Sequence, residues 1–177
     1  MNVATKSALL SMVLLAASAS AANASSAGSG TVTFTGDILE AACSIKPESV
    51  DQTVSLGQVA KSQLATGGTT STQGFQIELT GCSLTGLTDK AVTAVFTGAE
   101  STAVPGALGI VGTARGAGIM LVDGSGAPIV LGASTPKRVI SAGNNTLVYG
   151  AYLKGQATGA VTPGDFSAVT NFSLAYQ

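Results

Sequence analysis

The stretch FQIELT, residues 75–80, places apolar side chains at its odd positions and polar side chains at its even positions. Successive side chains of a β-strand point to opposite faces of a sheet, so this alternation predicts a strand with one packed face and one solvated face. The strand leads directly into Cys82, two residues after it ends.

A similar sequence pattern continues along the chain from Thr31 onward, with short runs rich in Val, Thr, Ile and Phe separated by Gly, Ser, Asn and Asp. Such runs predict strands joined by turns. We expect further strands at residues 91–97, 118–122, 129–131, 138–141, 147–153 and 166–176. Seven or so short strands indicate an all-β sandwich.

Between these strands the sequence predicts turns and loops. Residues 123–126, DGSG, lie between two apolar runs and predict a hairpin. Asn144-Asn145 predicts another turn, and residues 58–64 a short helical turn. Residues 65–73 and 100–118 are expected to be irregular loops.

The N-terminus has the pattern of a secretory signal peptide. Lys6 precedes an apolar run at residues 8–17, and Ala19-Ser20-Ala21 supplies small residues for cleavage. We expect removal of residues 1–21. A retained membrane anchor is the alternative, although the run is short for a spanning helix and no second long apolar stretch follows.

Residues 22–177 have the length of a single domain. The whole chain carries 8 basic and 9 acidic residues and a net charge of −1. A surface with this charge has no affinity for phosphate backbones, so we expect no nucleic-acid partner.

The chain contains two cysteines, Cys43 and Cys82. An even number of cysteines in an exported chain predicts a disulfide, here closing a loop of about forty residues. Two buried free thiols are the alternative.

Both ends of the predicted mature chain have apolar stripes at period two. Near the N-terminus, Gly30, Val32, Phe34, Gly36 and Ile38 share one strand face. At the C-terminus the even-numbered residues share a face, namely Phe166, Ala168, Thr170, Phe172, Leu174 and Tyr176. An apolar strand at a chain end either pairs within its own domain or adds to a neighbouring molecule.

The chain resembles the major structural subunit of type 1 fimbriae, in the chaperone-usher pilin family. The resemblance covers nearly the whole chain and rests on four segments taken together: GTVTFTG at residues 30–36 followed by AAC at 41–43, VDQTVSLGQV at 50–59, GFQIEL at 74–79 with Cys82, and FSLAYQ at 172–177.

This resemblance implies an incomplete immunoglobulin-like β-sandwich that is completed by donor-strand exchange and has one disulfide. Residues 22–39 would form the donor-strand extension and residues 40–177 the pilin domain. Val32 and Phe34 would fill pockets of a groove in the next subunit, with Gly30 at a shallow position and Gly36 near the end of the inserted strand.

The resemblance also implies the partners of the chain. Phe172, Leu174 and Tyr176 would line or border the acceptor groove, and the Gln177 carboxylate would meet basic residues of a periplasmic chaperone. An outer-membrane usher would then exchange the chaperone strand for that of an identical subunit. The expected product is a surface fimbria that contains other fimbrial subunits and mediates cell adhesion.

Catalytic chemistry is not expected. The chain contains no histidine, which excludes a Ser-His-Asp or Cys-His site, and its carboxylates are scattered. We therefore expect no enzyme activity, no cofactor and no metal. The alternatives to a rod subunit are a minor fimbrial adaptor and a self-contained secreted binding domain. Residues 99–118 match no motif and remain without a role.

Overall fold

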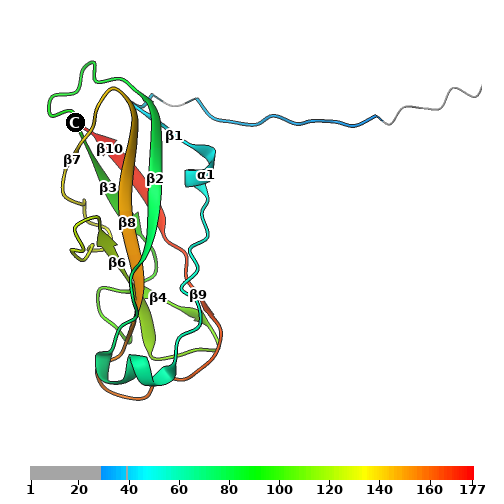
Figure 1. Cartoon of the computed structure of the whole chain (residues 1–177), viewed down its shortest axis with the longest axis vertical. Helices are drawn as coiled ribbons and strands as arrows, with labels where there is room; N and C mark the ends of the chain where they lie inside the picture. The colour runs from blue at the N-terminus through cyan, green and yellow to red at the C-terminus, as the bar shows by residue number, and fades with distance from the viewer. Residues whose placement is uncertain (1–28, 39) are drawn as a thin grey trace, which may run out of the picture. The chain divides into compact units, whose positions relative to one another are not determined.

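The computed structural model describes residues 29–38 and residues 40–177 (Figure 1). The chain divides into two units, one ending at Ile38 and a compact one from Leu39 to Gln177. The predicted signal peptide lies outside the described residues. No helix in the described part is long and apolar enough to cross a membrane.

Residues 29–38 contain no helix or strand, and the side chains of Val32, Phe34 and Ile38 are exposed. The compact unit consists almost entirely of strands. Its elements are β1 (Ser44–Ile45), α1 (Pro47–Val50), the 3₁₀ helix η1 (Lys61–Gly67), β2 (Gln73–Cys82), β3 (Ala91–Thr97), β4 (Leu108–Gly109), β5 (Val111–Gly112), β6 (Ala117–Asp123), β7 (Arg138–Val139), β8 (Gly143–Gly155), β9 (Phe166–Ser167) and β10 (Asn171–Tyr176).

The strands form two main sheets, with every pairing antiparallel. One sheet has the order β1-β2-β8-β6-β4 and the other the order β10-β3-β7, while β5 and β9 form a separate pair. The predicted strand at residues 75–80 lies at the centre of β2, and its odd-numbered residues Ile77 and Leu79 are buried. The prediction of an all-β sandwich is confirmed.

The core lies between the two sheets. β2, β6 and β8 contribute alternate apolar side chains from one sheet, and β3 contributes Val92, Ala94 and Phe96 from the other. Phe96 packs edge-on against Tyr149 of β8 with ring centroids 4.9 Å apart, and lies 6.3 Å from Phe172 of β10. Aromatic pairs in this range contribute beyond their buried area. This aromatic cluster ties β10 to the centre of the fold.

One strand prediction and one turn prediction need correction. Residues 129–131 form no strand: an isolated bridge joins Val122 to Pro128 and the Ile129 N–H donates to the Leu121 carbonyl, but Pro128 has no N–H with which to extend a ladder. The Asp123 turn itself is present, with the Gly126 N–H donating to the Asp123 carbonyl. Asn144-Asn145 is not a turn but lies at the start of β8, where Asn145 pairs with Leu79 of β2. The Asn145 amide also binds the N–H and the carbonyl of Ser141.

Residues 100–118 were expected to form an irregular loop. They include the two-residue strands β4 and β5, and the segment 101–108 builds a small second core. In it, Val104 and Ala107 pack on Met120 of β6, outside the main core. Buried Ser101 fixes this loop, because its hydroxyl accepts from the Val104 N–H and donates to the Ala117 carbonyl.

Candidate functional site: the open edge of β10

The C-terminal strand β10 is an edge strand. It pairs with β3 along its whole length, from Asn171 opposite Thr97 to Tyr176 opposite Val92. Beyond it, Gln177 exchanges two backbone hydrogen bonds with Ala91. No other described strand pairs with β10, so the backbone groups on its second side are available.

The even-numbered residues of this segment face the core without being covered by it. Phe172, Leu174 and Tyr176 pack against the core cluster, yet each is only partly buried, and the odd-numbered residues between them are exposed. The same alternation runs back through Ala168 and Phe166. By contrast, core residues at the centre of β2 and β3, such as Ile77, Leu79 and Phe96, are at most 1% exposed. The core is therefore incompletely covered along this edge.

The pKa of Tyr176 reflects its position at this edge. Partial burial of the phenol, which disfavours the charged form, raises the pKa of Tyr176 above its ordinary value. Tyr149 deeper in the core has a raised pKa for the same reason. The edge is thus an apolar environment even though it is not closed.

A second segment contributes apolar side chains to the same core. Residues 51–60 belong to no helix or strand, and Leu56 and Val59 pack partly buried against the core cluster. In Figure 1 this segment runs along the domain from α1 to η1. The sequence prediction omitted Leu56, Val59, Phe166 and Ala168 as site residues. The alternation Val54-Ser55-Leu56 is the signal that indicates the first of them.

Side chains tie the start of this segment to β2. The buried Ser49 hydroxyl accepts a hydrogen bond from the Glu78 N–H at 3.0 Å. The Gln52 amide donates to the Ser49 carbonyl at 3.1 Å and to the Gln76 carbonyl at 2.8 Å. These contacts satisfy β2 backbone groups where β1 has ended, and they position the segment that follows.

Replacing Ser49 by alanine should lower the free energy of unfolding by about 1–3 kcal/mol, because the Glu78 N–H loses its partner in a partly buried place. Chemical unfolding measures the change. Ser44 is an exposed serine of β1 and provides the matched control, so Ser44→Ala should stay within about 0.5 kcal/mol. Equal effects in the two variants would contradict the role of Ser49.

The predicted disulfide is present between Cys43 and Cys82, with both residues buried. It joins the first residues of the compact unit to the end of β2. No group of three or more His, Cys, Asp or Glu side chains in the described ranges is placed to hold a metal ion.

The donor residues of the prediction lie in the other unit of the chain. Val32 and Phe34 are exposed within residues 29–38, where Gly30 and Gly36 have nothing near their Cα hydrogens. The predicted donor and acceptor residues thus belong to separate segments. In both segments the apolar side chains recur at every second, even-numbered position.

Comparison with known proteins supports one family. The family model "Fimbrial protein" matches residues 32–177. The chain is 48% identical to the Fimbria A protein of Serratia marcescens over 170 residues, covering 96% of this chain and 97% of that protein. It is 44% identical to the Major MR/P fimbria protein of Proteus mirabilis, covering 85% of each.

Solved structures agree with this relationship. A subunit of a chaperone-usher pilus matches with a TM-score of 0.77 at 34% identity, over 85% of this chain and 97% of that one. The P pilus rod subunit PapA matches with a TM-score of 0.69 at 35% identity, over 77% of this chain and 100% of that one. The fold is therefore the immunoglobulin-like fold of chaperone-usher pilus subunits, and the chain belongs to the fimbrial protein family.

Proposed function

We propose that this protein is the major structural subunit of a surface fimbria and that it polymerises by donor-strand exchange. Residues 29–38 of one copy add to the open edge of β10 in another copy. The observation that carries this proposal is the row of half-buried core residues, Phe172, Leu174 and Tyr176, on a strand with one unpaired side.

The donor segment has the chemistry that this edge requires. Val32 and Phe34 bring large apolar side chains at period two, and burial of each stabilises the pair by about 1.5–3 kcal/mol. Hydrogen bonds between the two backbones set the register. Leu56 and Val59, on the segment tied to β2, would form the opposite wall of the acceptor site.

The uncovered edge also explains why the subunit needs partners before it polymerises. A periplasmic chaperone would cover β10 and meet the Gln177 carboxylate, and an outer-membrane usher would exchange the chaperone strand for the next donor. Within this scheme residues 1–21 are the signal peptide, 22–39 the donor extension and 40–177 the pilin domain. The protein's work in adhesion is mechanical and requires no catalysis, in line with a family of structural subunits.

The names of relatives favour a rod subunit over a minor adaptor, since several are major fimbrial proteins. A rod subunit is the most abundant protein of sheared fimbriae, whereas an adaptor is scarce. Quantitative mass spectrometry of sheared fimbriae distinguishes the two.

Strand addition is tested with a chain that lacks residues 22–38 and a synthetic peptide covering residues 29–38. The peptide binds only the folded domain, so it should stabilise that domain by about 2.7 kcal/mol at a concentration 100-fold above its Kd. Thermal unfolding measures this as a higher midpoint. A peptide carrying Phe34→Arg is the control and should have little effect. A truncated domain that is already stable and ignores the unmodified peptide would refute the proposal.

A further inference from the structure

A hollow of about 570 Å³, here called the η1 pocket, lies at one end of the compact unit. It is lined by Lys61, Ser62, Ala65 and Thr66 of η1 and by residues 159–161 of the loop that leads to β9. Within the compact unit, η1 lies at one end, whereas β1 and the C-terminus lie at the other (Figure 1).

The η1 pocket continues both walls of the acceptor edge. One wall, the segment 51–60, runs directly into η1. The other wall is the apolar stripe that begins at Phe166, and residues 159–161 come shortly before it in the chain. Val161 is buried in the core cluster against which Phe166 packs. The pocket is therefore an extension of the acceptor edge beyond the start of the stripe.

The proposed filament sets the direction of the donor segment along β10. A donor parallel to β10 would leave the acceptor at the end where β10 stops, which is also the end where β1 lies (Figure 1). Like ends would then meet, and two copies could exchange donors and close as a dimer. A donor antiparallel to β10 leaves at the η1 end, so unlike ends meet and the chain of copies stays open, as a filament requires.

An antiparallel donor brings its last residues to the η1 pocket. The donor segment 29–38 and the stripe 166–176 have nearly equal lengths, about 30–35 Å at about 3.3 Å per extended residue. A donor that starts beside Tyr176 therefore ends beside Phe166. At that point Ile38 reaches the pocket.

The last donor residues have the chemistry that the pocket requires. Ile38 is fully exposed in the single chain, and in an extended donor it faces the same side as Phe34. Asp37 faces the opposite side, toward the rim where Lys61 is exposed. Lys61 takes part in neither ion pair of the described residues. An apolar contact bordered by opposite charges favours one register.

We propose that the η1 pocket is a second anchor for the donor segment, outside the edge of β10. Ile38 of one copy inserts into the η1 pocket of the next copy, and Asp37 pairs with Lys61 at its rim. The anchor fixes how far the donor enters, because Ile38 reaches the pocket only when Phe34 lies on the edge. This inference rests on the proposed function.

Cysteine cross-linking in filaments of the full chain tests the anchor. Ala160 is an exposed residue of the pocket, so Ile38→Cys with Ala160→Cys should give a reductant-sensitive ladder of covalent multimers on a denaturing gel. The control combines Ile38→Cys with Val139→Cys, because Val139 is 82% exposed on β7, at the other edge of the β10-β3-β7 sheet. Single-cysteine variants report exchange with Cys43 or Cys82.

Filaments that lack this ladder, or that give an equal ladder in the control, overturn the anchor and leave strand addition standing. Absence of filaments from the unmodified chain overturns the proposed function, and the anchor with it. Where the double-cysteine variant gives no filaments, the rate of filament dissociation decides.

Dissociation in guanidinium measures the contribution of Ile38. Ile38→Ser removes an apolar side chain that the pocket buries, so its filaments should dissociate at least about tenfold faster than unmodified ones. Thr35→Ser is the matched control on the opposite face of the donor and should leave the rate unchanged. Equal rates for Ile38→Ser and unmodified filaments overturn the anchor.

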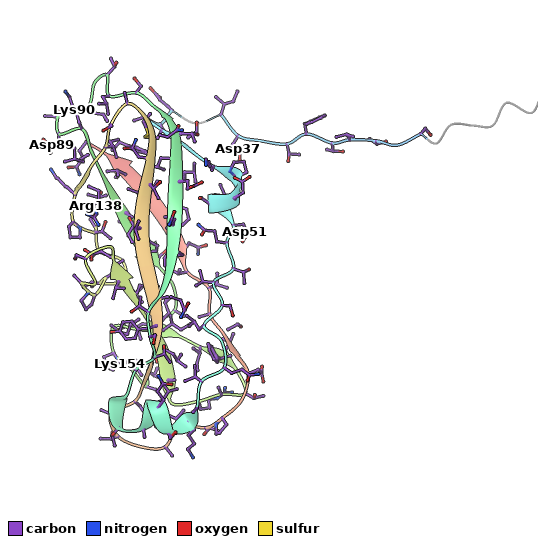
Figure 2. All side chains as sticks on the ribbon, in the orientation of Figure 1. Asp37, Asp51, Asp89, Lys90, Arg138 and Lys154 are labelled. Carbon is purple, nitrogen blue, oxygen red and sulfur yellow. A yellow bond between two sulfur atoms is a disulfide. The ribbon has the colours of Figure 1, made fainter. Side chains whose placement is uncertain are left out.

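The same assay at low salt tests the ion pair. Lys61→Glu should speed dissociation about two- to fivefold, and adding Asp37→Lys should restore the rate. Lys90→Glu is the control, because Lys90 is exposed and lies at the end of the compact unit opposite η1 (Figure 2). A charge swap that fails to restore the rate overturns the pairing of Asp37 with Lys61.

Discussion

Replacing Phe34 by arginine should abolish polymerisation while leaving the subunit itself as stable as before. In the single chain Phe34 is 90% exposed, so the substitution removes no contact within the fold. In the proposed filament the ring is buried in the next subunit, which favours assembly by about 1.5–3 kcal/mol. A guanidinium in that apolar place has no partner, and burying it without one costs several kcal/mol more. Electron microscopy of cell-surface filaments measures the effect.

Thr33→Arg is the matched control, because in an inserted strand Thr33 would lie on the face opposite Phe34. Filaments should persist in that variant. Thermal unfolding of both purified variants should give the midpoint of the unmodified subunit. Normal filaments in the Phe34→Arg variant would rule out insertion of this residue, whereas loss of filaments in both variants would indicate a general effect of added charge.

Removing the disulfide should produce the largest loss of domain stability. Cys43 and Cys82 are 39 residues apart in sequence, and the chain-entropy relation gives about 4 kcal/mol for a loop of that length. This is a large part of the net stability of a typical domain. The double variant Cys43→Ser and Cys82→Ser should therefore unfold at much lower denaturant concentration, as measured by guanidinium unfolding followed by circular dichroism.

The unmodified protein in reductant is the second arm of that experiment and should lose a similar amount of stability. Two serines also place hydroxyls in buried positions, and the reductant arm separates that effect from the loss of the bond. A midpoint that moves little in either arm would show that the sheets hold this loop closed without the bond.

Much of the fold was predictable because period-two patterns mark half-buried strands directly. β3 has the predicted bounds, 91–97, and β6 extends the predicted strand by one residue at each end. The strand expected over 166–176 is interrupted between β9 and β10, yet its alternation of half-buried and exposed residues continues through the break. Side chains therefore keep the alternation of a strand between β9 and β10, where the backbone has no strand pairing.

The missed elements depend on contacts between distant residues, which no local pattern shows. α1 is a single turn whose Ser49 is fixed by Glu78, 29 positions away. β1, β4 and β5 have only two residues each, too few for a period. At the site, Phe172, Leu174 and Tyr176 were predictable from alternation, but the one-sided pairing of β10 was implied only by family resemblance, because a sequence does not state which strand ends a sheet.

The disulfide has a mechanical consequence for a fibre under tension. Pulling on the proposed filament draws on the donor segment, so the force enters each domain through residues 40–42 and arrives at Cys43. The bond to Cys82 passes that force to β2, a ten-residue strand paired with β8, and so bypasses β1, which has only two residues. Detaching β2 requires the hydrogen bonds of its long pairing with β8 to break, whereas detaching β1 requires only those of a two-residue pairing. The covalent link thus moves the point of attack from a two-residue strand to the ten-residue strand β2.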